Sequence, residues 1–134
     1  MKRLSVLVIL LITPVLASCG DDDADDGSAT ITVALDDFSF APAAVTATAG
    51  TDVTVTASNI GGIRHSWVLL NEGEEVTTTA GITDDRVLAS TADLDPGQSE
   101  SITFTAPAPG TYQIVCHIPG HTEARMMGTL TVGG

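Results

Sequence analysis

Residues 110–130 read GTYQIVCHIPGHTEARMMGTL, and this stretch decides how the rest of the chain can fold. It holds a thiol at Cys116, an imidazole five positions later at His121, and a thioether five positions after that at Met126. The residues before the cysteine predict a strand, and a turn through the intervening Pro-Gly pair can bring the three side chains to one point. We therefore predict a metal-binding loop.

The donor types of this loop suit copper. Thiolate and thioether favour Cu(I), imidazole also accepts Cu(II), and two His, one Cys and a weak axial Met describe a blue-copper electron-transfer centre. His117 neighbours Cys116 on an extended segment, so its side chain should point to the opposite face. That leaves His65 as the second imidazole, and the predicted ligands of a single copper ion are His65, Cys116, His121 and Met126.

Strand periodicity separates the two neighbouring methionines. If the segment after them is a strand, Met126 shares a face with Leu130, whereas Met127 shares the opposite face with Thr129. The apolar face is the inner one. Met126 is therefore the predicted axial ligand, and Met127 is predicted to lie at the surface.

Other interpretations of the loop explain less. A structural zinc site needs four strong Cys or His ligands, and the loop has no second thiol. A centre with two coppers bridged by two cysteines fails for the same reason. Without any metal, Cys116 would be a small buried residue and the methionines would fill gaps, which leaves their joint spacing unexplained.

The first twenty residues, MKRLSVLVILLITPVLASCG, have the features of a secretory signal. A basic start precedes an apolar run that is too short and too broken for a spanning helix. Residues 16–19, LASC, resemble the bacterial lipobox, whose cysteine becomes the lipidated first residue. We expect residues 1–18 to be a lipoprotein signal peptide and Cys19 to carry the lipid; an ordinary signal peptide cut near here is the alternative.

Residues 19–29 are predicted to be a lipidated acidic linker, because they contain the charge run DDDADD. A calcium site there is disfavoured, since nothing fixes the carboxylates in a loop. Lipid on Cys19 and copper on Cys116 would leave no idle thiol, which suits an oxidising compartment. The expected location is the extracytoplasmic face of a bacterial membrane, in the periplasm or at the cell surface.

The charge balance limits the choice of partners. The full chain has a formal net charge of −12, and without residues 1–18 it keeps three basic and 17 acidic residues, a formal charge of −14. Such a surface repels nucleic acid and anionic lipid. The composition therefore argues against nucleic-acid binding.

Residues 30–134 are predicted to form one all-β domain. β-Branched residues alternate from residue 30 onward, and closely spaced turn signals are typical of a β-sandwich. The acidic, poorly periodic segment at about 71–85 is predicted to be a flap outside the sandwich, with room for a short helical turn. The eight expected strands cover residues 30–35, 45–49, 52–58, 66–70, 86–91, 99–105, 111–116 and 127–132.

Five segments carry ordered motifs: HSWVL at 65–69, RVLA at 86–89, SITF at 101–104, GTY at 110–112, and PGH leading to MMGTL at 119–130. Together they resemble the azurin and auracyanin branch of the cupredoxins, over essentially all of residues 30–132. The resemblance implies a Greek-key β-sandwich with one type 1 copper at one end, bound by residues matching the four predicted ligands. It also implies one-electron transfer through the edge of the His121 ring, within an apolar surface patch.

Two positions near the predicted ligands depart from that family's pattern. Ser66 stands where the family commonly has Asn, which bonds across to a hydroxyl residue after the cysteine, and His117 stands at that second position. The cross-link is expected to be weaker, or replaced by a Ser66–His117 hydrogen bond. Arg64 stands where azurins place a glycine whose carbonyl approaches the metal, so a fifth contact is not assumed.

Electron carriage transforms no substrate, so the chain is predicted not to be an enzyme. Copper oxidases and nitrite reductases need a further copper centre with several more histidines, and only His117 is unassigned. The alternatives are an accessory type 1 subunit of such an enzyme, or a carrier or storage protein that releases its copper. The expected partners are a protein electron donor and acceptor that meet a monomer.

Three arginines are the only cations expected in the mature chain. Arg64 and Arg125 directly precede proposed ligands, so they are predicted to flank the apolar patch around His121 as a positive rim that docks an acidic partner. Met127 is a further candidate docking residue. The alternative is that each arginine, including Arg86, pairs with a nearby carboxylate such as Glu123.

Overall fold

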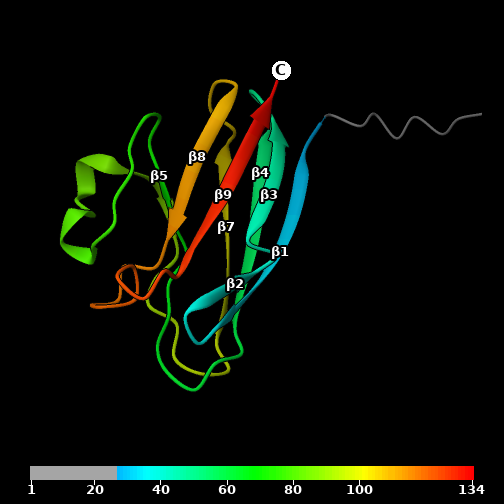
Figure 1. The fold of residues 1–134 in the computed structure, drawn as a ribbon. Helices are drawn as coiled ribbons and strands as arrows, with labels where there is room; N and C mark the ends of the chain where they lie inside the picture. Colours follow the sequence, from blue (N-terminus) through cyan, green and yellow to red (C-terminus); the bar gives the residue numbers. More distant parts are fainter. Residues whose placement is uncertain (1–26) are drawn as a thin grey trace, which may run out of the picture.

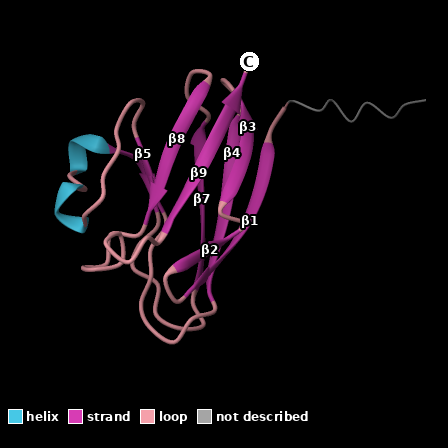
Figure 2. Cartoon of the chain, viewed as in Figure 1, coloured by secondary structure: helices cyan, strands magenta, loops and turns pink. Residues whose placement is uncertain are grey.

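The computed structural model describes residues 27–134, which form two β-sheets packed face to face (Figures 1 and 2). One sheet has the order β2-β1-β4-β7, and its strands are β1 (Ala29–Asp36), β2 (Ser39–Ala41), β4 (Asp52–Asn59) and β7 (Ser99–Thr105). The other has the order β3-β9-β8-β5-β6, and its strands are β3 (Ala44–Thr48), β9 (Met127–Gly133), β8 (Gly110–Val115), β5 (Val68–Leu70) and β6 (Val87–Ser90). The predicted all-β sandwich is confirmed.

Alternation along the strands builds the core. In β4, Val53, Val55 and Ala57 are fully buried, and the residues between them face outward. On that outer face Thr54 and Thr103 of β7 lie 2.9 Å apart, Oγ1 to Oγ1. The period of two therefore separates an apolar inner face from a hydroxyl-rich outer face.

The core between the sheets extends to one end of the sandwich. Trp67, just before β5, is buried and stacks on Phe104 of β7, with ring centroids 6.2 Å apart. Cys116 and Met126 belong to the same buried cluster and are both 0% exposed. The two predicted sulfur ligands thus lie in the hydrophobic core, where bulk water is excluded.

Two strands differ from the sequence prediction. β2 was not predicted: it has only three residues and follows a tight turn in which Phe38 has a φ of 63°. β5 starts at Val68 rather than Ser66, because His65 forms an isolated bridge with Leu94 and the backbone N–H of Ser66 donates to the Cys116 sulfur. Residues 27–134 therefore contain nine strands where eight were expected.

The predicted acidic flap lies outside the sandwich beside β5 (Figure 1) and contains two short 3-10 helices, Thr79–Gly81 and Asp84–Arg86. It is held to the sheet at Val76, which is buried against Val68 and Val115. The Gln113 side chain on β8 accepts from Val76 N at 2.7 Å and donates to Val76 O at 2.9 Å. The flap is thus fixed by both packing and hydrogen bonds.

Gly128 lies where β9 passes the chain entering β3. A Cβ at this position would come 2.5 Å from the carbonyl oxygen of Ala43, an acceptor already used by Thr129 N. We expect Gly128→Ala to lower the free energy of unfolding by about 1–3 kcal/mol, because the strands must move apart. Gly133→Ala is the matched control in the same strand, since a Cβ there meets nothing within 4 Å. Equal denaturation midpoints for the two variants would contradict this account.

Candidate metal centre

His65, Cys116 and His121 bring their donor atoms together at one end of the core. The three residues are buried, and their donor atoms all lie within 4.8 Å of one another. The two Nδ1 atoms are 3.2 Å apart, and Nδ1 of His121 lies 3.5 Å from Sγ of Cys116. Two nitrogens and one sulfur therefore face a common point, and the ring nitrogens in the Nε2 position are left for other partners.

The loop that carries Cys116 and His121 is stabilised by hydrogen bonds of its own. Thr122 Oγ1 donates to the carbonyl of Cys116 at 2.8 Å. The backbone N–H of His121 donates to Ile118 O, and that of Met126 donates to His121 O, each at 3.0 Å. These contacts fold the chain back on itself within a few residues, as the Pro-Gly turn predicts.

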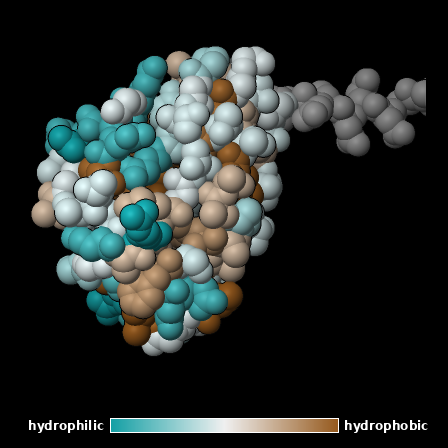
Figure 3. Space-filling model, in the orientation of Figure 1, coloured by the Kyte–Doolittle hydropathy of each residue, from teal (hydrophilic) through white to brown (hydrophobic). Residues whose placement is uncertain are grey.

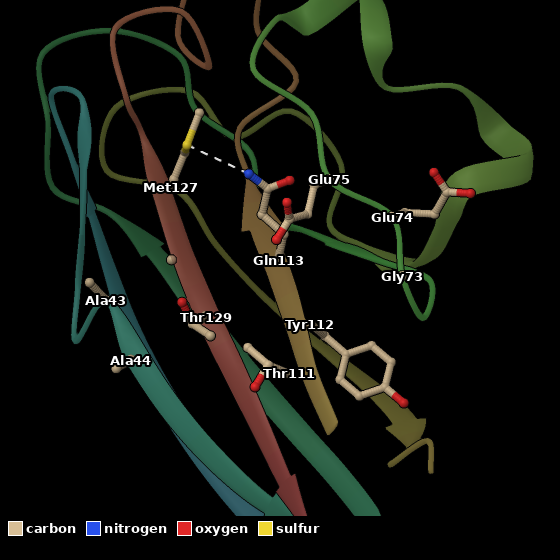
Figure 4. Close-up of a pocket in the computed structure, with 11 residues that line it drawn as sticks. Ala43, Ala44, Gly73, Glu74, Glu75, Thr111, Tyr112, Gln113, Met127 and Thr129 are labelled. Atoms are coloured by element: carbon tan, nitrogen blue, oxygen red, sulfur yellow. Dashed lines mark hydrogen bonds between the residues drawn. The ribbon is translucent and has the colours of Figure 1, made fainter. Parts of the chain in front are cut away.

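The two methionines occupy different faces, as the periodicity predicts. Met126 is fully buried in the cluster that contains Cys116. Met127 packs against a separate small cluster under the flap, and its sulfur lies 3.6 Å from Nε2 of Gln113 (Figure 4). It lines a hollow of about 450 Å³ on the outer side of β8 and β9, and it is partly buried rather than a free surface residue.

Asp37 is a contact of the site that the sequence did not reveal. It lies in the turn between β1 and β2, and its Oδ1 is 3.0 Å from Nε2 of His65. This hydrogen bond is the main reason why the pKa of Asp37 lies below its usual value. Only the acidic pair Asp36-Asp37 hinted at this turn, and nothing in its spacing linked it to a histidine 28 positions away.

The pKa of His121 is lowered from its ordinary value near 6.5, first by burial and then by the nearby His65. A lower pKa keeps the imidazole neutral at pH 7, which is the form that binds a metal. The ring of Phe38 meets that of His121 edge-on, with centroids 5.0 Å apart. The turn between β1 and β2 thus touches both candidate histidine ligands.

Ser66 and His117 form a hydrogen-bonded group behind Cys116. Nε2 of His117 lies 2.6 Å from Oδ1 of Asp93, and an N–H there leaves Nδ1 as the acceptor for Ser66 Oγ at 3.1 Å. The backbone N–H of His117 also donates to Ser66 Oγ at 3.1 Å. The structure therefore has the Ser66–His117 hydrogen bond, and His117 points away from the donor cluster.

Ser66→Ala should remove these two hydrogen bonds and leave part-buried groups of His117 without a partner. We expect a loss of about 1–3 kcal/mol in the free energy of unfolding. Ser99→Ala is the matched control, because its hydroxyl bonds Ser58 Oγ on an exposed face. Equal losses for the two variants in urea unfolding would show that the group behind Cys116 adds no stability.

Two of the three arginines form ion pairs with carboxylates, and the third does not. Arg64 pairs with Asp95 at 2.9 Å and Arg86 with Glu74 at 3.3 Å, all of them substantially exposed. Arg125 makes no ion pair within residues 27–134 and has a φ of 67°. Glu123 binds Thr79 instead of an arginine. A positive rim would thus rest mainly on Arg125, because Asp95 offsets the charge of Arg64.

Exposed apolar residues lie on the segments that contact or lead to the candidate ligands. Phe38, Ile60 and Ile63 are the large hydrophobic side chains that stay exposed in the described part of the chain. Phe38 touches His121, and Ile60 and Ile63 come from the loop that leads to His65. Figure 3 shows apolar residues beside strongly hydrophilic ones at the lower end of the molecule, where these loops lie in Figure 1.

Residues 6–132 match the family model described as "Cupredoxin-like domain". The chain belongs to this family. It is 40% identical to auracyanin-B of Chloroflexus aurantiacus over 119 residues, which are 76% of this chain and 50% of that relative, so the chain spans about half the length of auracyanin-B. It is also 31% identical to the copper-resistant cuproprotein CopI of Rubrivivax gelatinosus, over 82% of this chain and 70% of CopI.

Solved cupredoxin structures share the fold. The structure of auracyanin B superposes with a TM-score of 0.71 at 36% identity, over 79% of this chain and 89% of that one. That of auracyanin A from Chloroflexus aurantiacus, described as a "blue" copper protein, gives 0.70 at 27% identity, over 80% and 100%. The resemblance to the auracyanin and azurin branch is confirmed.

The residues present fit the cofactor of a cupredoxin. Two imidazole nitrogens, one thiolate sulfur and a buried methionine nearby are the donor types of a type 1 copper site. The predicted cofactor, one type 1 copper ion, is confirmed. Among the described residues, no helix is long and apolar enough to cross a bilayer.

Proposed function

We propose that this cupredoxin carries single electrons between protein partners, with copper held by His65, Cys116, His121 and Met126. When bound, copper supplies the one-electron Cu(I)/Cu(II) chemistry. The observation that carries the proposal is the buried convergence of two Nδ1 atoms and one thiol at the end of a packed core. Within the described part of the chain no second cluster of this kind is found, which disfavours the further copper centre that an oxidase needs.

The chain holds its donors in place before a metal arrives. The backbone of His65 exchanges two hydrogen bonds with Leu94, at 3.1 and 2.8 Å. The carbonyl of Cys116 is bound by Thr122, and its sulfur accepts the N–H of Ser66 at 3.4 Å. Small ligand movement keeps the barrier to electron transfer low, so a fixed donor frame suits a redox carrier better than a site that must release its metal.

His121 is the proposed exit for the electron. His121 is 6% exposed, and the exposed ring of Phe38 packs against its imidazole. An apolar surround lets a partner approach closely without stripping water from charged groups. The proposed docking residues Arg64, Arg125 and Met127 would add orientation, with Arg125 as the main positive charge.

Membrane attachment is part of the proposal. The lipobox-like sequence LASC supports a lipid on Cys19. The acidic run that follows it supports a tether between the lipid and β1. Both features fit a domain held on the outer side of the membrane. Cys19 lies outside the described residues. Cys19→Ala should leave a precursor that carries no lipid. An unchanged mass together with unchanged detergent partitioning of the variant would refute the lipid anchor.

A copper carrier is the second candidate, favoured by the similarity to the copper-resistant cuproprotein CopI. The two functions are separated by mixing copper-loaded protein with a high-affinity chelator, and by voltammetry of the same sample. An electron carrier keeps its copper over many minutes and gives a reversible one-electron wave. Rapid transfer of copper to the chelator without a reversible wave would favour the carrier and overturn the proposal.

A further inference from the structure

The contact between Asp37 and His65 determines which imidazole nitrogen faces the metal site and which one donates a hydrogen bond. Nδ1 of His65 faces the other donors, 3.2 Å from Nδ1 of His121. Nε2 lies on the opposite side of the ring, 3.0 Å from Oδ1 of Asp37. A ring that gives Nδ1 to a metal carries its proton on Nε2, so the N–H of Nε2 donates to the carboxylate.

The turn that carries Asp37 is shaped around this hydrogen bond. The N–H of Gly62 donates to the same Oδ1 at 3.0 Å. A Cβ at Gly61 would overlap Oδ1 of Asp37 and lie 2.9 Å from Nε2 of His65. The absence of a side chain at Gly61 is therefore what lets the carboxylate reach the buried ring.

We propose that Asp37 is a positioning residue for His65 and that its carboxylate lowers the reduction potential of the copper site. This inference rests on the proposed function. A carboxylate that accepts the Nε2 proton makes the imidazole a stronger donor and fixes the ring orientation. A stronger donor and a nearby negative charge stabilise Cu(II) more than Cu(I).

The exposure of the Asp37 carboxylate does not abolish its effect on the reduction potential. The side chain of Asp37 is 46% exposed, so solvent screens its direct Coulomb interaction with the metal. The side chain of His65 is 0% exposed, however, and the hydrogen bond acts through the ring itself. The effect of Asp37 should therefore exceed that of an equal charge placed beside it.

Asp37→Asn and Asp36→Asn provide a matched pair. Both remove one negative charge, at neighbouring positions, but the side chain of Asp36 accepts a hydrogen bond only from the N–H of Asp37 in the structure. Asparagine keeps an acceptor oxygen at position 37, so the fold and the ring orientation should survive. We expect Asp37→Asn to lower the ratio of Cu(II) to Cu(I) affinity about tenfold, the low end for such partners, which raises the potential by about 59 mV. Asp36→Asn should change the ratio less than twofold.

Gly61→Ala gives a second arm that leaves every charge in place. Its Cβ should push the carboxylate off His65, so it should raise the potential as Asp37→Asn does. Gly62→Ala is the control, because its Cβ would lie at an ordinary 3.5 Å from Oδ2. NMR of the Cu(I) protein should show a protected Nε2 proton on His65 that is lost in Gly61→Ala and kept in Gly62→Ala.

Equal shifts of potential in Asp37→Asn and Asp36→Asn, or an unprotected Nε2 proton in the wild type, would overturn the inference. Both results are interpreted only if the wild-type protein binds one copper and shows its visible band. A wild type without that band would instead refute the proposed function, so the two failures are distinguishable.

Discussion

Cys116→Ser is expected to abolish the intense visible absorption of the copper-loaded protein. That band arises from a Cu(II)–thiolate bond, and Cys116 is the sole cysteine of the described residues, fully buried and 3.5 Å from His121 Nδ1. Serine is close in size to cysteine, so the sandwich should still fold. The absorption spectrum and the unfolding curve of the variant, recorded together, measure both parts of this expectation.

Cys19→Ser is the matched control, because it makes the same exchange at the other cysteine of the chain. It should keep the full band. A band that persists in Cys116→Ser and disappears in Cys19→Ser would show that the thiolate of Cys116 is not the sulfur ligand.

Met126→Gln is expected to lower the reduction potential, whereas Met127→Gln should leave it nearly unchanged. An amide oxygen is a harder donor than a thioether and stabilises Cu(II) relative to Cu(I). A tenfold change in that preference corresponds to about 59 mV, and the shift in Met126→Gln should be at least of this order. Voltammetry of both variants provides the comparison.

The neighbouring methionines are a useful pair because only their faces differ. Met126 lies in the main core with Cys116, and Met127 packs under the flap beside Gln113. If Met127→Gln shifts the potential and Met126→Gln does not, the assignment of the axial ligand is wrong, and the periodicity argument that led to it fails.

The donor residues could be predicted from the sequence because metal chemistry restricts both residue type and spacing. Cys116, His121 and Met126 lie on one short loop, so local turn geometry suffices to bring them together. The strand period explains why His117 and Met127 point elsewhere. Only His65 required a long-range contact, and the small number of histidines made that choice simple.

The contacts that surround the donors were harder to predict from the sequence. Asp37 reaches His65 through a turn between β1 and a three-residue strand, which carries too little periodicity to be predicted. The pairs His117–Asp93 and Arg64–Asp95 join residues 24 and 31 positions apart on exposed segments. A chain with many carboxylates offers many equivalent partners, so only the fold decides which of them is used.

The central claim is that this chain holds one redox-active type 1 copper. A titration of the metal-free protein with Cu(II), followed by reduction and reoxidation in the same cuvette, tests it most directly. The account predicts an intense visible band that saturates at one equivalent, bleaches on reduction and returns in full on reoxidation. A colourless complex, or saturation at two or more equivalents, would contradict it.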